Sequence, residues 1–169
     1  DKYQQVIGCS NPVAGNYYNF TIPQPQGVAV SIAPATPSLL GLITAIGAPL
    51  CSGNTVVALG SQAHPMATAI LGEVCQTSDV PAGVINLLTG KKSELLEHIA
   101  THRQVASLYV SDCSKKERVL LEEGSADSMK RVHTVSFTEE DWYDNSITAS
   151  PWEIGPFVEM KTIWHPSAC

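Results

Sequence analysis

The sequence has few charged residues, no basic cluster and none of the short motifs that mark common nucleotide-binding proteins and serine hydrolases. Charged residues make up 15% of the chain and the net charge is −6, whereas an average domain is about one quarter charged. This acidic balance argues against nucleic acid and anionic membranes as partners. The patterns GxGxxG, GxxxxGK followed by Ser or Thr, and GxSxG are absent. Their absence removes the usual sequence evidence for a dinucleotide fingerprint, a P-loop or a nucleophile elbow.

Long apolar runs and paired cysteines are also missing. The five cysteines form no CxxC pair and are odd in number, which favours reduced thiols over a disulfide framework. No signal-peptide pattern opens the sequence, so we expect a cytoplasmic protein. No apolar stretch is long enough to predict a membrane-spanning helix. The most apolar region is interrupted by turn-forming residues, namely Pro34, Pro37, Gly47, Pro49 and Gly53.

Strand-like and helix-like segments alternate over most of the chain. This alternation predicts βαβ units around a parallel sheet, and therefore an α/β, Rossmann-like fold with helices on both faces. Ser114 and Glu117 form a capping-box pattern at the start of one helix, and Gly124 is expected to end that helix. The spacing predicts strands over 17–23, 27–33, 55–59, 84–88, 105–110, 130–137 and 157–164, and helices over 39–50, 64–77, 94–102 and 115–123.

Five segments, in the same order along the chain, resemble motifs of the aldehyde dehydrogenase family. The segment 53–65, Gly-Asn-Thr-Val-Val followed by a turn and a helix start, is similar to the cofactor strand of that family. Segments 24–29, 80–90 and 129–132 resemble other parts of its cofactor domain, and 158–163 resembles its carboxyl-terminal association strand. The resemblance implies an NAD(P)-dependent ancestor that oxidises aldehydes.

The resemblance also implies a division of the chain into three parts. Residues 1–137 are expected to form a degenerate NAD-binding-like α/β domain. Residues 138–154, called the connector below, are acidic and polar and stand where an ordinary member carries its catalytic domain. Residues 155–169 are expected to form an oligomerisation-type strand and tail. This arrangement is similar to the second module of the two-module, family-sixteen aldehyde dehydrogenases.

The residues that hold the cofactor in the family are replaced in this chain. The lysine and the glutamate that hold the adenine-side ribose fall on Leu59 and Gln62, and a proline between them falls on Gly60. Leucine donates no hydrogen bond, and a glutamine amide is a weaker acceptor than a carboxylate. We therefore expect no cofactor, with at most weak NAD binding.

The positions that carry catalysis in the family are replaced as well. The oxyanion-hole asparagine falls on Thr36, whose hydroxyl reaches less far than an amide. The nicotinamide loop falls on Ser111 and Asp112, where a side chain and a negative charge replace glycine and serine. The general base falls on Val135, which cannot accept a proton. The family's nucleophilic cysteine lies in the region that is missing here, so no catalytic residue is predicted and the chain is expected to be a pseudoenzyme module.

Two functions fit these observations. The first is a non-catalytic aldehyde dehydrogenase-like domain for assembly or protein-partner binding. The second is part of an NAD-dependent aldehyde dehydrogenase whose catalytic module lies elsewhere in a longer chain. In the first, the carboxyl-terminal strand pairs with a partner protein or a second copy. The predicted interface residues are Glu159, Met160, Lys161, Thr162, Ile163 and Trp164.

Three other features of the sequence resemble parts of functional sites. His98 and His102 lie one helical turn apart like half a zinc site, but no third ligand is evident, and no metal is predicted. Cys113 precedes a helix start, which can lower a thiol pKa, although no histidine partner accompanies it. The acidic run 139–141 beside 142–143 could form a carboxylate pair with a sugar platform, but a solvated connector with an anchoring aromatic residue is favoured.

Overall fold

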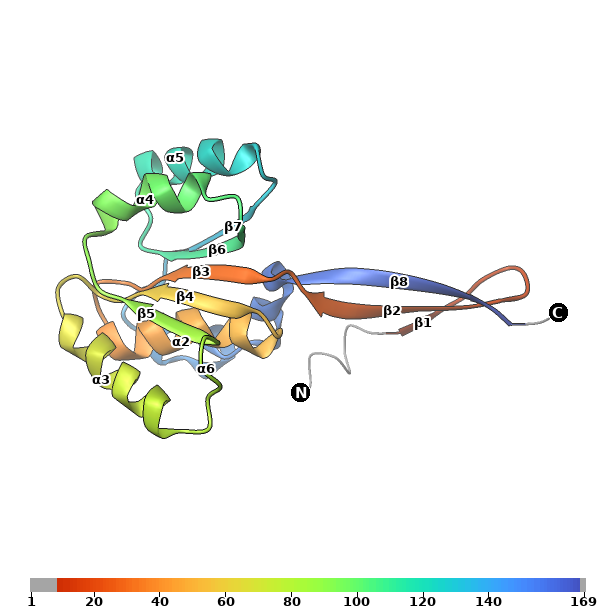
Figure 1. Cartoon of the computed structure of the whole chain (residues 1–169), viewed down its shortest axis with the longest axis horizontal. Coiled ribbons are helices and arrows are strands. Elements are labelled where there is room, and N and C mark those ends of the chain that lie inside the picture. Colours follow the sequence, from red (N-terminus) through yellow and green to blue (C-terminus); the bar gives the residue numbers. More distant parts are fainter. Residues whose placement is uncertain (1–8, 168–169) are drawn as a thin grey trace.

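The computed structural model describes residues 9–167, and they form an α/β body from which a long β-arm projects (Figure 1). Residues 1–8 and 168–169 of the predicted first and third parts lie outside the described residues. The body is built on a parallel sheet with the strand order β5-β4-β3-β6-β7. This order confirms the predicted Rossmann-like α/β fold. Its strands are β3 (Val28–Ile32), β4 (Thr55–Leu59), β5 (Ile85–Leu88), β6 (Val105–Ser111) and β7 (Arg131–Val135).

Helices cover both faces of this sheet, as predicted. Figure 1 shows α2 (Ser38–Cys51) and α3 (Pro65–Thr77) on one face, and α4 (Lys92–Thr101) and α5 (Lys115–Ala126) on the other. Buried residues of α2 recur at helical spacing, and they pack against alternate residues of β4. Leu108 and Val110 of β6 point to the opposite face, where they meet α4 and α5. The sheet is therefore buried on both sides, which explains its nearly continuous apolar strands.

Helix α5 does not end at Gly124 as the sequence predicts, but continues to Ala126. Gly124 lies where α4 and α5 approach each other, and a Cβ atom added there would lie 2.6 Å from Ala100 Cβ. The glycine is therefore present for close packing between two helices and not for a C-cap conformation. The prediction was wrong because sequence alone does not distinguish these two uses of glycine.

A substitution of Gly124→Ala tests this explanation. Alanine is intrinsically better in a helix by about 1 kcal/mol, but overpacking against Ala100 costs about 1–3 kcal/mol. We expect net destabilisation in urea unfolding. Gly72→Ala on α3 is the matched control, because its added Cβ would make only ordinary contact, 3.8 Å from Leu87 Cδ1. That variant should gain stability, and an equal gain in Gly124→Ala would contradict the packing explanation.

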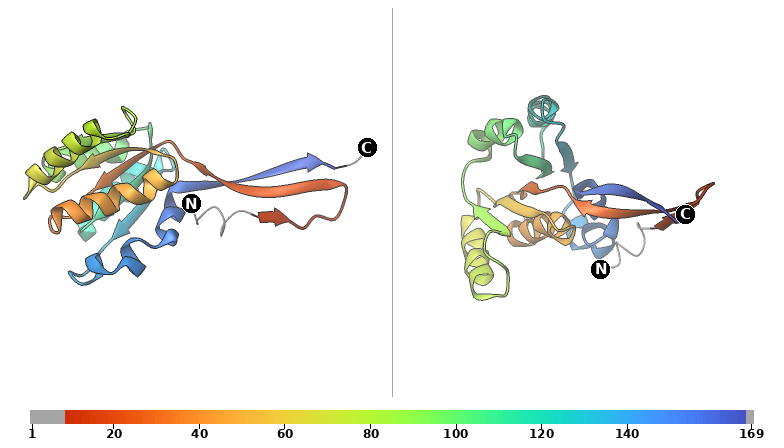
Figure 2. Two further views of the ribbon diagram at one scale, coloured as in Figure 1. Left: turned by 90° about the horizontal axis from the view of Figure 1, so that it is seen from below. Right: turned by 45° about the vertical axis from the view of Figure 1, so that its right-hand side comes forward.

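The arm is an antiparallel sheet that contains both ends of the described chain. It consists of β1 (Cys9–Asn11), β2 (Tyr17–Pro25) and β8 (Val158–Pro166), in the order β1-β2-β8. The strand predicted over 157–164 is therefore confirmed, with bounds shifted by one residue at its start and two at its end. The views of Figure 2 show the arm extending away from the body.

Asn54 joins the arm to the body. Its Oδ1 accepts hydrogen bonds from the backbone N–H groups of Gln26 (2.7 Å) and Gly27 (2.8 Å), at the bend where β2 leads into β3. Its Nδ2 donates to the Phe157 carbonyl (2.8 Å), directly before β8. The two predicted strands on either side of this bend therefore belong to different sheets. A buried amide at this point satisfies backbone groups that neither sheet can pair.

The connector folds over the α2 side of the body. It contains η1 (Asp141–Tyr143), α6 (Asn145–Thr148) and the start of η2 (Pro151–Phe157). Trp142 is buried, and its ring meets that of Phe137 edge-on at 4.9 Å between centroids. This contact confirms the predicted anchoring aromatic residue. The strand before the connector ends at Val135, earlier than the predicted residue 137.

Candidate functional site

A crevice lies at the carboxyl ends of the parallel strands, beside the central strand β3. In doubly wound sheets, ligands bind at this end, where successive connections run to opposite sides of the first strand. The crevice has a volume of about 210 Å³. The chain brings five of the residues singled out from the sequence together in its lining, namely Leu59, Gly60, Gln62, Ser111 and Asp112.

Two other predicted positions are not part of the lining. Thr36 is exposed just after β3, next to Ala35, which does line the crevice. Val135 is buried at the end of β7 and packs in a cluster with Tyr109 and Phe157. Neither provides a titratable or amide group to the crevice.

The end of β4 has become part of the apolar core. Leu59 is 2% exposed and packs with Val30 and Leu96. At Gly60, an added Cβ would lie 1.8 Å from Thr68 Oγ1, so the chain and α3 approach closely at this position. Gln62 is exposed at the rim. This side of the crevice therefore offers one neutral amide side chain to a ribose, and no charged group.

The amino terminus of α5 is occupied by a carboxylate of the same helix. The Ser114 N–H donates to Glu117 Oε2 (2.8 Å), and the Glu117 N–H donates to Ser114 Oγ (3.3 Å), which completes the predicted capping box. Lys92 Nζ, at the start of α4, donates to the same Glu117 Oε2 (3.2 Å) and to the Asp112 carbonyl oxygen (3.0 Å). This Lys92–Glu117 pair links the starts of both helices beside the crevice, and its side chains are only 22% and 28% exposed.

Glu117 carries its negative charge at neutral pH. Burial raises the pKa of this carboxyl group, but hydrogen bonds from Ser114 and the charge of Lys92 outweigh burial and lower the pKa overall. A helix amino terminus attracts anions, and in dinucleotide-binding folds it receives the pyrophosphate. Here the internal carboxylate takes up that attraction, and Asp112 adds another acidic group beside it. The residues at this crevice do not fit NAD.

Lys92 was not identified from the sequence. Its signal is weak, because a lysine two residues after the turn at Gly90 looks like an ordinary solvated helix start. Its partner Glu117 lies 25 positions further along the chain, so only the fold brings the two together.

The remaining sequence signals do not form a site. Burial raises the pKa of the Cys113 thiol, and the charge of Lys92 only partly opposes this. Cys113 is therefore not an activated thiolate. His102 Nδ1 faces the Gln104 N–H at 3.3 Å. Across the part of the chain that the structure describes, no three His, Cys, Asp or Glu residues lie close enough to hold a metal ion.

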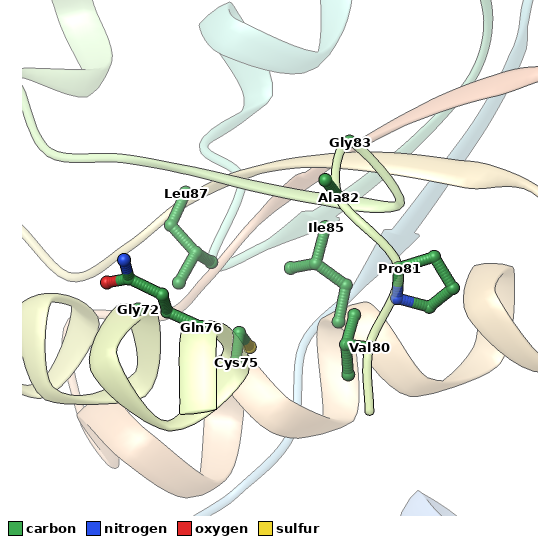
Figure 3. Close-up of a pocket in the computed structure, with 9 residues that line it drawn as sticks. All are labelled: Gly72, Cys75, Gln76, Val80, Pro81, Ala82, Gly83, Ile85 and Leu87. Carbon is green, nitrogen blue, oxygen red and sulfur yellow. The ribbon is translucent and has the colours of Figure 1, made fainter. Parts of the chain in front are cut away.

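Another hollow lies between α3 and β5 (Figure 3), with a volume of about 440 Å³. Its lining comes from the second half of α3, the turn over 80–83 and the first residues of β5, so it lies away from the strand ends that form the crevice. Ile85 and Leu87 point from the strand toward the helix. Cys75 and Gln76 are the polar side chains of this hollow, and its lining contains no Asp, Glu, Lys or Arg. It offers no acid–base pair.

The predicted interface residues all lie on β8, at one edge of the arm. β8 pairs with β2 along its whole length, for example Thr21 with Thr162, whose hydroxyl oxygens lie 3.0 Å apart. Its other edge pairs with no strand in the described residues. Glu159 lies at the root of the arm, 3.6 Å from Arg131, and Trp164 near its tip is 60% exposed. Ile163 is half-buried, whereas Met160, Lys161 and Thr162 are exposed.

The strand order, the two helical layers and the crevice at the strand ends define a doubly wound nucleotide-binding type of domain. The aldehyde dehydrogenase family model matches residues 2–135. The chain therefore belongs to the aldehyde dehydrogenase family, which confirms the resemblance drawn from its motifs.

Individual relatives agree with this assignment. Human retinal dehydrogenase 2 is 30% identical over 128 residues, which are 76% of this chain and 25% of that protein. The crystal structure of a putative aldehyde dehydrogenase from Burkholderia cenocepacia has a TM-score of 0.67 at 27% identity, covering 78% of this chain and 27% of that one. The NAD+ complex of an aldehyde dehydrogenase from Bacillus cereus shares the fold, with a TM-score of 0.72 at 23% identity over 79% and 27% of the two chains. This chain thus spans about a quarter of the length of the relatives it matches.

Proposed function

We propose that this chain is a non-catalytic aldehyde dehydrogenase-like module that assembles with a protein partner, in the simplest case a second copy, through the outer edge of β8. The observation that carries this proposal is the arm itself. Within residues 9–167, the outer edge of β8 pairs with no other strand and presents a row of N–H and C=O groups, which is a template for another strand. Strand addition of this kind gains main-chain hydrogen bonds, and side chains along the strand provide specificity.

The exposed aromatic residues of the arm support the same conclusion. Tyr17, Tyr18 and Trp164 are 52%, 54% and 60% exposed. Small sheets need a covered hydrophobic face for independent stability. The rings of Tyr17 and Trp164 meet edge-on at 6.0 Å between centroids, whereas Tyr18, the next residue of β2, points to the other face of the arm. A partner strand that pairs with β8 and covers the first of these faces would remove Tyr17 and Trp164 from water.

The non-catalytic part of the proposal rests on the crevice. Leu59 is a core residue, the α5 amino terminus is filled by Glu117, and Val135, which the motif resemblance aligns with the family's base, is buried. Val135 cannot take a proton from a substrate as the family's glutamate does. Formation of NADH from NAD and an aldehyde by this chain alone would overturn this part.

A second candidate function is supported by the length comparison. The match to the human relative includes 76% of this chain but only 25% of that protein. On this second proposal the module belongs to a longer NAD-dependent aldehyde dehydrogenase, which would supply the nucleophile and the base from another module. Under both proposals this module serves assembly, and only the second predicts an oxidoreductase activity of the whole protein.

Proline substitutions in β8 test the assembly proposal. Consecutive residues of an antiparallel strand direct their N–H groups to opposite edges. Of Lys161→Pro and Thr162→Pro, one therefore removes an N–H that faces β2 and the other removes an N–H that faces the free edge. We expect the wild-type chain to form an oligomer by light scattering. The free-edge variant should lose the oligomer while its thermal stability stays closer to that of the wild type.

The comparison contains its own control, because the two variants carry the same substitution on adjacent residues. The variant that faces β2 reports damage to the arm through a lower melting temperature. An unchanged mass in both variants, or a wild-type chain that is monomeric at every concentration, would refute self-assembly through β8.

A further inference from the structure

Positive charge is distributed unevenly between the two faces of the body. No Lys or Arg occurs over residues 3–90 or 132–160, so α2, α3 and the connector contain none. The lysines and arginines of the body lie instead on or next to α4, α5 and β7. Of these elements, α4 and α5 cover the opposite face of the sheet (Figure 1). Acidic side chains occur on both faces, and the α2–α3 side with the connector carries Glu73, Glu139, Glu140, Asp141, Asp144 and Glu153.

A groove lies on this acidic side, between α2 and the connector. It has a volume of about 510 Å³ and a mainly apolar lining. Such a volume lies in the range of sites that bury a ligand or an anchoring side chain. Its lining includes Leu40, Ile43 and Ala48 of α2, and Thr148, Glu153 and Ile154 of the connector segment.

The floor and rim of the groove suit a helix. Ile43, Gly47 and Cys51 follow each other at four-residue spacing on α2 and line the groove. A Cβ added at Gly47 would meet no atom within 4 Å, so a neighbouring backbone can approach there. Ile43 is 48% exposed, which is a large exposed fraction for a β-branched apolar residue. Glu153 lines the other wall, and one of its oxygens lies 3.3 Å from His133 Nε2.

We propose that this groove is a docking site for a basic amphipathic helix of a partner protein. Apolar grooves receive the apolar face of such helices through anchors at helical spacing. The acidic connector complements lysine or arginine on the flanks of the helix, and neither α2, α3 nor the connector carries a lysine or arginine that would repel them. The groove is built partly from the connector and lies on the α2 side of the body, so it is a different surface from the outer edge of β8.

The test uses a fluorescently labelled peptide of about 18 residues, helical in design, with leucine on one face and lysine on the other. It is titrated against the full chain and followed by fluorescence anisotropy. We expect saturable binding that weakens as salt is raised. In Ile43→Lys, binding should weaken by about tenfold or more, because the substitution removes an apolar contact and adds a like charge.

Ile70→Lys is the matched control. Ile70 is also an isoleucine on an outer helix of the same face, is 54% exposed, and does not line the groove. It should change binding by less than about twofold. Because both isoleucine side chains are about half exposed, we expect both variants to keep the fold, and circular dichroism checks this.

Three outcomes would overturn the proposal. One is the absence of saturable binding to the wild-type chain. Another is equal weakening by Ile43→Lys and Ile70→Lys, which would mean diffuse attraction to an acidic surface. The third is a wild-type oligomer that Ile43→Lys dissociates, since this would assign the groove to a second copy. The β8 variants leave the groove intact, so failure of this test is separate from failure of assembly through β8.

Discussion

Titration of the chain with NAD+ is expected to give no saturable heat up to about 1 mM cofactor. Two features at or beside the crevice both weaken NAD+ binding. The motif resemblance aligns Leu59 and Gln62 with the family's charged ribose ligands, and the Glu117 carboxylate occupies the amino terminus of α5 beside the crevice. Hydrogen bonds to charged groups contribute about 1.5–3 kcal/mol each. Loss of the two ribose contacts alone corresponds to about two to four decades in affinity.

The Glu117→Gln variant separates the two causes. It keeps the size of the side chain and removes the carboxylate that competes with a phosphate for the helix end. If this variant gains saturable binding while the wild type has none, the internal carboxylate is the dominant obstacle. If neither binds, removal of the negative charge alone does not restore the site, because glutamine can still accept the Ser114 N–H hydrogen bond. Saturable binding of the wild type below about 0.1 mM would mean that other groups replace the lost contacts. Our assessment of the crevice would then be wrong.

The fold could be predicted from local patterns because each element of the body carries its own boundary signals. The β-branched run after Gly53-Asn54 gives β4 with the predicted bounds, 55–59, and Pro65 marks the first residue of α3. Proline is tolerated there because a first-turn N–H has no partner within the helix. The family assignment followed from several such segments in a fixed order.

The sequence could not show which of these segments meet in space. Two runs with the same β pattern on either side of Gly27 enter different sheets, because Asn54 and Phe157 hold the bend between them. Gly124 looks like a helix end, yet it lies at a helix–helix contact. The Lys92–Glu117 pair depends on two helix starts being adjacent. Hydrophobic periodicity and secondary-structure propensity describe one element at a time. They therefore predict neither the bend between the two sheets, nor the helix contact at Gly124, nor the Lys92–Glu117 pair.

Replacement of Trp142 by alanine is expected to destabilise the chain by about 3–5 kcal/mol, the usual cost of truncating a buried aromatic side chain. Trp142 is 3% exposed, contacts Phe137 edge-on, and has its Cη2 atom 3.6 Å from the Cβ position that Gly41 lacks. The ring therefore holds the connector against α2. Urea unfolding followed by circular dichroism measures the loss.

Trp152→Ala is the matched control, because Trp152 lies in the same connector but is 63% exposed. Exposed substitutions of this kind change stability by about 0.5 kcal/mol or less. A large difference between the two variants would mean that the connector is a packed element of the body, with Trp142 as its anchor. Equal, small effects would mean that it is a loosely attached linker. The groove between α2 and the connector would then lose one wall, so the proposed docking site also depends on this result.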